Sequence, residues 1–270
     1  MGERRSNRRR RVRKECRAPA GSEIEERPYR ELALIYDELV GDTAFECWKE
    51  NHERLVDRYG IKFKVAADVA CGTGNAARYL AGTCNRVYGV DVSPEMLEVA
   101  GEKVSAPNVV LLEGSFTGFE LPEEVDLLTC NFDSLNYLLR EEEVARALSR
   151  FGRFVRSGGY CIFDMNTTRE LEVEWGTSVS LHRVSGAICV WEFDWDPEMR
   201  TSTLMMTNFF KLGNGLFRMS EEVHRERSYE TDIILGLLND AGFSRADAFD
   251  ARDLTGVNEQ TRRVQFIARK

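Results

Sequence analysis

The stretch VAADVACGTGN, residues 65–75, joins an apolar run that contains one acid to a glycine turn. This pattern predicts a buried strand followed by a turn that opens a helix. A second apolar run, residues 86–91, ends in Asp91 and predicts the next strand. Such a unit places backbone N–H groups and a helix N-terminus against a ligand, and its final acid is placed to bond a ribose diol. We therefore expect this half of the chain to bind a nucleoside-containing cofactor.

Two cofactors fit a glycine turn of this kind. Gly72, Gly74 and Ala77 also satisfy the loose dinucleotide pattern G-x-G-x-x-A, which is a weak signal alone. Three features argue against NAD. Asp68 would repel a pyrophosphate. Some sixty residues precede the unit, whereas dinucleotide folds often start near it. The chain also ends in a strand-like pair within residues 243–268, with no helix after it.

Asp68, Gly72, Thr73, Gly74 and Asp91 together resemble the class I methyltransferases that use S-adenosylmethionine (SAM). The resemblance covers about residues 29–270, and is closest to small bacterial and archaeal methyltransferases of small or unassigned substrates. Further marks of that group are Ser93–Leu97, Tyr36–Leu39, Cys130–Tyr137, Phe163–Asn166 and Glu222–Tyr229. The resemblance implies an α/β, Rossmann-like sheet of seven strands, SAM as cofactor and S-adenosylhomocysteine as product.

The resemblance also implies the cofactor contacts. Asp68 is expected to contact the methionine amino group, directly or through water, and Asp91 the ribose hydroxyls. The family often has an Asp after the third strand that binds the adenine amino group. Here Ser115 and Phe116 stand in that region, which is a departure from the pattern. The other expected cofactor residues are Ala70, Gly72, Gly74, Val92, Met96, Asn131 and Phe132.

Three aromatic residues of the N-terminal helices, Tyr29, Tyr36 and Trp48, either close over the cofactor or pack as aromatic core. On the acceptor side, Asp133 and Tyr137 belong to a polar cluster after the fourth strand, where loop polarity is often functional. Helix capping is the alternative role for Asp133.

His224 is one of three histidines in the chain. A histidine suits removal of a proton from an amine or hydroxyl, although a lone histidine in a strand is more often structural. We expect His224, Asp133 and Tyr137 to be the catalytic candidates.

The pattern of apolar runs predicts one domain over residues 29–270, after a basic disordered tail and linker over residues 1–28. Two helices, Arg30–Val40 and Ala44–Tyr59, should form an N-terminal cap. Strands are expected near 65–70, 86–91, 109–113, 125–131 and 159–165, and helices near 74–82, 94–104, 141–155 and 229–241. Within 170–228, three strands (187–195, 201–212 and 216–228) should form an antiparallel lid, with an Asn-Gly turn between the last two.

The bulk composition limits the class of protein. A chain of 270 residues with 43% hydrophobic content can bury one full core, and no apolar run approaches the ~20 residues of a membrane span. Seven irregularly spaced cysteines favour a reducing cytoplasm and give no readable metal site. Residues 1–17 carry nine basic and two acidic side chains, which is a net charge of +7. Because the whole chain has a net charge of −8, residues 18–270 have a net charge of −15. Such an acidic body disfavours nucleic-acid binding.

We therefore expect a cytoplasmic enzyme that moves a methyl group from SAM to an N or O atom of a small molecule, with no membrane partner and with a homodimer left open. One alternative is an RNA methyltransferase that uses the arginine-rich tail, and deletion of residues 1–17 would then abolish activity. A second is a non-catalytic SAM-binding protein. A third is a nucleotide-dependent oxidoreductase, which should bind NAD rather than SAM.

Overall fold

The computed structural model describes residues 29–270, which form two sheets and the helices around them. The predicted basic tail and linker, residues 1–28, lie outside the described residues. Within residues 29–270, none of the helices has the length and apolar character required to cross a membrane.

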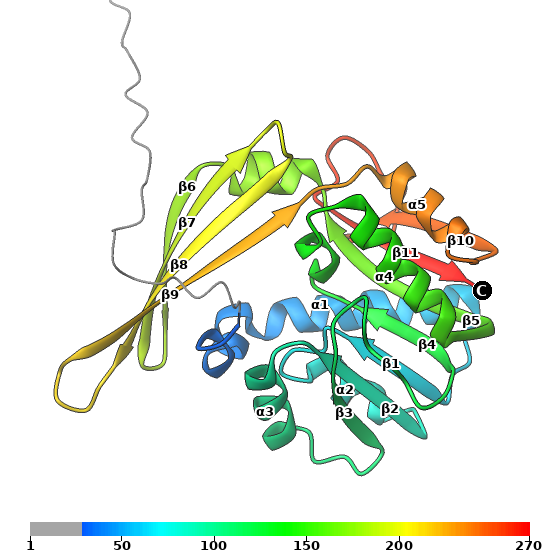
Figure 1. Cartoon of the computed structure of the whole chain (residues 1–270), viewed down its shortest axis with the longest axis horizontal. Helices are drawn as coiled ribbons and strands as arrows, with labels where there is room; N and C mark the ends of the chain where they lie inside the picture. The colour runs from blue at the N-terminus through cyan, green and yellow to red at the C-terminus, as the bar shows by residue number, and fades with distance from the viewer. Residues whose placement is uncertain (1–28) are drawn as a thin grey trace, which may run out of the picture.

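The main sheet has seven strands in the order β10-β11-β5-β4-β1-β2-β3 (Figure 1). Strands β1 to β5 are parallel, whereas β11 runs antiparallel to both β5 and β10. The bounds are β1 Val65–Val69, β2 Arg86–Asp91, β3 Val109–Glu113, β4 Val125–Cys130, β5 Val155–Asn166, β10 Arg245–Asp250 and β11 Arg263–Arg269. The predicted α/β class and seven-stranded sheet are confirmed.

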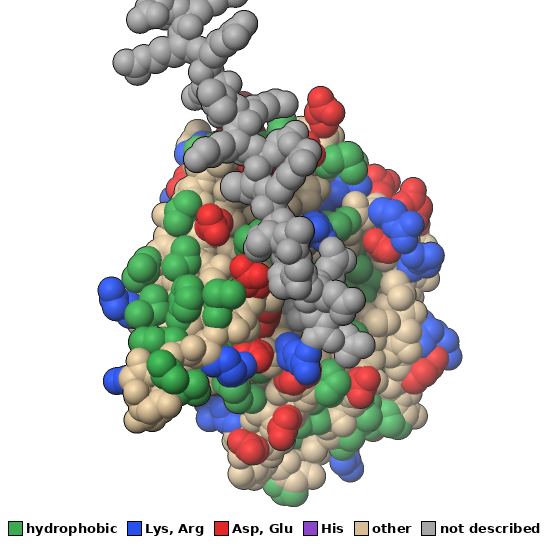
Figure 2. Space-filling model, turned by 60° about the vertical axis from the view of Figure 1, so that its left-hand side comes forward, with side chains coloured by type: hydrophobic (Ala, Val, Ile, Leu, Met, Phe, Trp, Pro, Cys, Tyr) green, Lys and Arg blue, Asp and Glu red, His purple; other side chains and the backbone are tan. Residues whose placement is uncertain are grey.

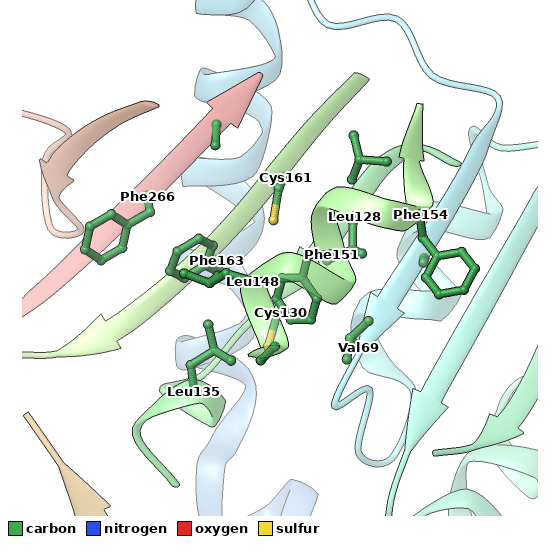
Figure 3. Packing of buried hydrophobic residues seen from close by; sticks show 14 of the residues in the cluster. Val69, Leu128, Cys130, Leu135, Leu148, Phe151, Phe154, Cys161, Phe163 and Phe266 are labelled. Carbon is green, nitrogen blue, oxygen red and sulfur yellow. The ribbon is translucent and has the colours of Figure 1, made fainter. Parts of the chain in front are cut away.

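Helices cover both faces of this sheet because successive strand residues point to opposite sides. On β4, Leu127 faces the cluster that includes Leu55 of α1 (Tyr36–Tyr59), while Leu128 faces the cluster that includes Phe151 of α4 (Glu141–Phe154). Figure 3 shows the second cluster, in which the rings of Phe163 and Phe266 stack at 4.9 Å between centroids. The remaining helices are α2 Asn75–Ala81, α3 Pro94–Lys103 and α5 Thr231–Asp240.

Two boundaries differ from the sequence-based expectation. The first predicted N-terminal helix is instead a short 3₁₀ helix, η1 (Leu32–Leu34), followed by α1, which is kinked at Gly41 with φ 74°. Gly41 adopts a left-handed conformation that ends the first helical stretch. In addition, the strand expected near 159–165 begins earlier, at Val155, and the pairing of β5 with β4 shifts register between Val155 and Tyr160.

The segment predicted as a lid forms a separate antiparallel sheet in the order β6-β7-β8-β9. Its bounds are β6 Ser178–Val184, β7 Ala187–Asp196, β8 Thr201–Lys211 and β9 Phe217–Arg227. The prediction of three strands was wrong by one, because β6 is an edge strand in which serine, histidine and arginine interrupt the apolar residues. Exposed apolar side chains, including Val179, Leu181 and Met219, lie on the outer face of this sheet (Figure 2).

Candidate active site

The turn between β1 and α2 exposes backbone at the carboxyl end of the sheet. Ala70, Gly72 and Gly74 all have left-handed φ values, of 58°, 52° and 81°. A Cβ at Gly74 would lie 2.8 Å from Val104 Cγ2, whereas nothing lies within 4 Å of a Cβ placed at Gly72. Gly74 therefore allows α2 to pack against the end of α3. Gly72 borders open space in which a ligand can approach the main chain.

Replacing Gly74 by alanine is expected to lower the free energy of unfolding by about 2–4 kcal/mol, from left-handed strain and overpacking together. Gly236→Ala is the matched control: it lies in α5, and its Cβ would meet nothing within 4 Å. That control should change stability by no more than about 1 kcal/mol, in the stabilising direction. Guanidinium titrations of both variants measure the difference, and equal midpoints would contradict the packing argument.

Asp91 ends β2 next to the glycine turn. Its Oδ2 accepts a hydrogen bond from Gly72 N at 2.8 Å, and its Oδ1 accepts one from Ser93 N at 2.9 Å. Burial raises the pKa of Asp91, although the backbone N–H groups of Ser93 and Gly72 oppose this shift. Each oxygen has a further lone pair, so the carboxylate is fixed by the main chain and can still accept from a diol.

The residues around Asp91 follow the start of α3. Val92 is 63% exposed, which leaves an apolar side chain beside the carboxylate. Ser93 caps α3 by accepting from Met96 N at 3.2 Å, and Met96 itself is buried. Ser115 follows β3 at the same edge of the sheet, where Gly114 N donates to Asp91 O. The adenine contacts expected of Ser115 and Phe116 stay predictions.

Asp68 lies on β1 within hydrogen-bonding reach of β4. Its Oδ1 accepts from Thr129 Oγ1 at 2.8 Å and from Asn131 Nδ2 at 3.2 Å. Burial raises the pKa of Asp68 to about 7, because a carboxylate loses its hydration there. The amide oxygen of Asn131 is buried and has no hydrogen-bond partner among residues 29–270. This pair offers a carboxylate and an unused acceptor to a bound ammonium group.

We expect SAM binding to release up to about one proton near pH 6, because a bound ammonium favours the ionised form of Asp68. In the ligand-free protein the folded state binds more protons than the unfolded state between the usual pKa of 3.8 and about 7. The contribution of Asp68 to stability therefore falls as pH rises through this window. Calorimetry at pH 6 in two buffers of different ionisation enthalpy measures the release. It should vanish in Asp68→Asn, and buffer-independent heats with the wild type would refute it.

An ion pair that the sequence did not reveal ties α1 to the glycine turn. Asp37 accepts from Thr73 Oγ1 at 2.6 Å and from Lys103 Nζ at 2.6 Å, and Lys103 also donates to Thr73 and Asn75. Tyr36, the residue before Asp37, is also buried. Burial raises its pKa, and the negative charge of Asp133 raises it further. The motif Tyr36–Leu39 was the only sequence signal for this contact.

Trp48 lies apart from this group, three turns further along α1 than Asp37. Its ring stacks on His52 at 5.3 Å and meets the ring of Tyr79 edge-on at 5.6 Å. The structure thus places Trp48 in an aromatic cluster with His52 and Tyr79, and a cofactor contact of Trp48 stays a prediction.

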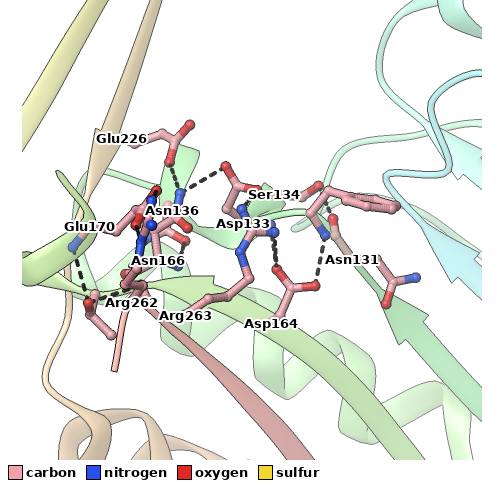
Figure 4. A network of polar contacts seen from close by, with 12 residues as sticks. Asn131, Asp133, Ser134, Asn136, Asp164, Asn166, Glu170, Glu226, Arg262 and Arg263 are labelled. Atoms are coloured by element: carbon pink, nitrogen blue, oxygen red, sulfur yellow. Dashed lines mark hydrogen bonds and ion pairs between the residues drawn. The ribbon is translucent and has the colours of Figure 1, made fainter. Parts of the chain in front are cut away.

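A cluster of carboxyl groups follows β4 and β5 (Figure 4). Arg263 Nη2 lies 2.8 Å from Asp133 Oδ1, and its Nη1 lies 3.0 Å from Asp164 Oδ1. Asn166 Nδ2 donates to Asp133 Oδ2 and to Glu226 Oε2, at 3.0 and 3.1 Å. Burial raises the pKa of Glu226, and the neighbouring charge of Asp133 raises it further. The site therefore holds three carboxyl groups, of which two contact the guanidinium of Arg263.

Asp164 also shapes the loop that carries the cluster. Phe132 and Asp133 have φ values of 56° and 53°, and their amides donate to the two oxygens of Asp164 at 2.9 and 2.7 Å. Two consecutive non-glycine residues rarely adopt this conformation, and such strain is typical of functional sites. Asp133 does not cap the following 3₁₀ helix, η2 (Ser134–Tyr137), with its side chain.

Three further predicted residues meet above this cluster. Tyr137 Oη lies 2.9 Å from His224 Nδ1 and 2.6 Å from Tyr29 Oη. His224 Nε2 lies 3.4 Å from Glu222 Oε2, which is longer than a typical hydrogen bond. Burial raises the pKa of both phenols, so they stay protonated at neutral pH. No role for Glu222 follows from the sequence pattern, although the alternation along β9 puts Glu222, His224 and Glu226 on one face.

The residues at this edge of the sheet fit SAM as a cofactor. Asp91 has free lone pairs for a diol, the exposed Val92 side chain lies beside it, and Asp68 can face an ammonium. The unused amide oxygen of Asn131 is a further acceptor. No group of side chains suited to a metal ion is present within residues 29–270.

Comparison with known proteins gives three similarities of different extent. Residues 66–159 match a family described as methyltransferase domain. A protein from Geobacillus sp. (strain WCH70), named as a candidate methyltransferase, is 29% identical over 90% of this chain and 99% of its own length. The Streptomyces fradiae dTDP-3-amino-3,6-dideoxy-alpha-D-glucopyranose N,N-dimethyltransferase is 34% identical over 50% of this chain and 52% of its own.

Among solved structures, a SAM-dependent methyltransferase from Clostridium acetobutylicum ATCC 824 superposes with a TM-score of 0.78. The two are 23% identical, and the match covers 89% of this chain and 98% of the other. The shared fold therefore includes both the seven-stranded sheet and the lid segment.

Proposed function

We propose that the chain, which belongs to the class I SAM-dependent methyltransferases, transfers the methyl group to an amine nitrogen of a small-molecule acceptor. The observation that carries this proposal is the excess of carboxyl groups beside the predicted cofactor residues. Asp133 and Asp164 contact the guanidinium of Arg263, and Asn166 Nδ2 bridges Asp133 and Glu226. A cationic amine would balance this charge, whereas a neutral alcohol or an anionic acceptor would not.

The carboxyl groups have a specific reason to hold an ammonium. Asp133 is only partly buried, with 15% of its side chain exposed, and each of its oxygens keeps a lone pair beyond its contact with Arg263 or Asn166. Glu226 is deeper, and its raised pKa favours the neutral acid. Asp133 is therefore the residue that we assign to hold the amine by a charge-assisted hydrogen bond.

An ammonium must lose a proton before its nitrogen can act as a nucleophile. Tyr29 Oη, Tyr137 Oη and His224 Nδ1 lie in a chain of hydrogen bonds, and the two phenols stay protonated. A proton from the amine can pass along the two hydroxyls to His224 Nδ1, while Nε2–H faces Glu222. The imidazole tautomer is inferred from these neighbours.

SAM supplies a methyl group on a positively charged sulfur. The protein therefore has to align the acceptor with this methyl group, exclude water and accept one proton. The lid sheet and residues 29–35 surround Tyr137 and His224, which restricts water around the relay. The name of the Streptomyces fradiae relative, an amino-sugar N,N-dimethyltransferase, supports an amine acceptor for this chain as well.

The test is a set of matched acceptors. Each pair consists of a small primary amine and the analogue in which a hydroxyl replaces the amino group, for example an aminodeoxy sugar and the parent sugar. The purified full chain is incubated with SAM, and S-adenosylhomocysteine is quantified together with the mass of the methylated product. Turnover of amines and not of their hydroxyl analogues supports the proposal. Turnover confined to the hydroxyl compounds would refute it.

Two further expectations belong to the same proposal. We place the enzyme in the reducing cytoplasm, because Cys47, Cys71, Cys84, Cys130, Cys161 and Cys189 are free thiols.

A homodimer would cover the apolar outer face of the lid sheet, around Leu181 and Met219. Cell fractionation and mass photometry test these two expectations separately.

A further inference from the structure

Glu222 of β9 is a buried carboxyl group that touches two parts of the site. Only 3% of its surface is exposed, and its position on β9 puts it on the same face as His224. On one side it faces the N-terminal segment, residues 29–35, and on the other side it faces the imidazole. A buried carboxylate requires hydrogen bonds on both oxygens to offset its loss of hydration.

The segment supplies three of these bonds from its backbone. Glu222 Oε2 accepts from Tyr29 N at 2.7 Å, and Oε1 accepts from Glu31 N and Leu32 N at 3.0 Å each. These amides lie at the start of η1, where N–H groups have no partner within the helix. Glu222 thus caps a helix that is 190 residues away in the sequence.

The same carboxylate closes a ring of contacts through the proposed base. Its Oε2 lies 3.4 Å from His224 Nε2, and His224 Nδ1 lies 2.9 Å from Tyr137 Oη. Tyr137 in turn contacts the hydroxyl of Tyr29, whose backbone N–H returns to Glu222. Displacement of residues 29–35 would break this ring at two points.

We propose that Glu222 is a positioning residue that couples docking of residues 29–35 over the site to the orientation of the base His224. With the segment docked, three amides hold the carboxylate 3.4 Å from Nε2, where its charge favours the tautomer with the proton on Nε2 and leaves Nδ1 to accept a proton. With the segment displaced, Tyr29 leaves the relay and Glu222 loses the amides that hold it. The site is then able to take up its acceptor but lacks an assembled relay. This inference rests on the proposed function for the role of His224.

The ionisation of Glu222 agrees with this role. Burial raises its pKa, but the nearby imidazole of His224 and the hydrogen bonds from the amides of Leu32 and Tyr29 outweigh burial and leave the pKa below its usual value. The charged or titratable groups around it are His224 on its own strand, Tyr29 and Glu31 of the segment, and Tyr137 of η2. Arg218 of β9 pairs with Glu31 rather than with Glu222.

The first test needs no acceptor. Glu222→Gln keeps the size of the side chain but turns one oxygen into a donor that faces backbone donors. Amide hydrogen exchange of Tyr29, Glu31 and Leu32 should accelerate about tenfold or more, because the docked state loses one or two of its three backbone hydrogen bonds to Glu222. Glu221→Gln is the matched control, since Glu221 points to the opposite face of β9. Unchanged exchange in Glu222→Gln overturns the coupling, whether or not amines prove to be the acceptors.

The second test separates positioning from capping alone. With an acceptor, Glu222→Gln should lower kcat about tenfold or more with little change in the Kd for SAM. The ascending limb of the kcat–pH profile should move to lower pH, because an imidazolium forms less readily beside an amide than beside a carboxylate. Tyr29→Phe, which keeps the backbone cap, should lower kcat without accelerating exchange of residues 31 and 32. Faster exchange in Glu222→Gln with an unmoved pH profile would reduce Glu222 to a structural cap and refute the proposal.

Discussion

Replacing Asp91 by asparagine is expected to raise the Kd for SAM by up to about 100-fold, because asparagine keeps one acceptor oxygen and loses one hydrogen bond to a charged acceptor, which contributes about 1.5–3 kcal/mol. In the structure each carboxylate oxygen already accepts one backbone N–H, from Gly72 and from Ser93. A ribose diol therefore has to use the second lone pair of each oxygen. Asparagine has a single acceptor oxygen, so its amide group would face either Gly72 N or Ser93 N as a second donor. Calorimetric titration with SAM and with S-adenosylhomocysteine measures the loss.

The same experiment separates a loss of ligand contact from a loss of fold. Glu102→Gln removes one exposed acid from α3 and should leave both Kd values unchanged. Asp91→Asn should unfold cooperatively, although at a lower denaturant concentration, since one backbone donor loses its acceptor. An unaltered Kd for SAM in a folded Asp91→Asn protein would mean that the ribose is bound elsewhere. Binding of NADH in place of SAM would overturn the cofactor itself.

The regular part of the fold could be predicted because its signals are local. Residues 65–75 contain a strand, a turn and a helix start within eleven positions, and the structure has β1, the left-handed glycines and α2 there. Alternation of apolar and polar residues likewise placed β7, β8 and β9. The edge strand β6 was missed because an edge strand in a lid needs little burial, so its sequence lacks a continuous apolar face.

The candidate site was only partly predictable, for a different reason. Acids and polar residues at strand ends mark Asp68, Asp91 and Asp133, because the carboxyl ends of parallel strands share one edge. Their partners come from distant positions: Arg263 reaches Asp133 across 130 residues of sequence, and Glu222 reaches Tyr29 across 193. Nothing local in β9 or β11 indicates these contacts. For Trp48 the sequence left two roles open, because an aromatic residue in an N-terminal helix fits both a lid and a core.

The cofactor side and the acceptor side of the site differ in how closely their carboxyl groups lie together. The cofactor side fixes single carboxylates, at Asp68 and Asp91, with individual hydrogen bonds. The acceptor side instead crowds carboxyl groups, so that burial and the neighbouring charge of Asp133 both raise the pKa of Glu226. Crowding of this kind costs stability unless a cation binds. Loss of a single carboxylate charge on the acceptor side should therefore act mainly on the binding and turnover of a cationic acceptor.

Asp133→Asn is accordingly expected to lower kcat/KM for an amine acceptor about 10- to 100-fold, the value of one charge-assisted hydrogen bond. The variant is conservative at this position, since Asp133 has φ 53° and asparagine tolerates the left-handed region. Its amide oxygen can still accept from Arg263, so the fold should persist. The Kd for SAM should stay within about twofold, because no contact of Asp133 reaches Asp68 or Asp91.

A control variant and the pH dependence of the loss in kcat/KM test whether Asp133 binds the cationic form of the acceptor. Asp240→Asn, at the exposed end of α5, removes the same charge from the chain and should leave kcat/KM unchanged. Loss in Asp133→Asn should be greatest for acceptors that are cationic at the assay pH and should shrink as pH rises and the amine becomes neutral. An equal loss for amines and for hydroxyl analogues would indicate a general distortion of the loop. Unchanged amine turnover would show that the excess charge around Arg263 serves stability and that the acceptor binds elsewhere.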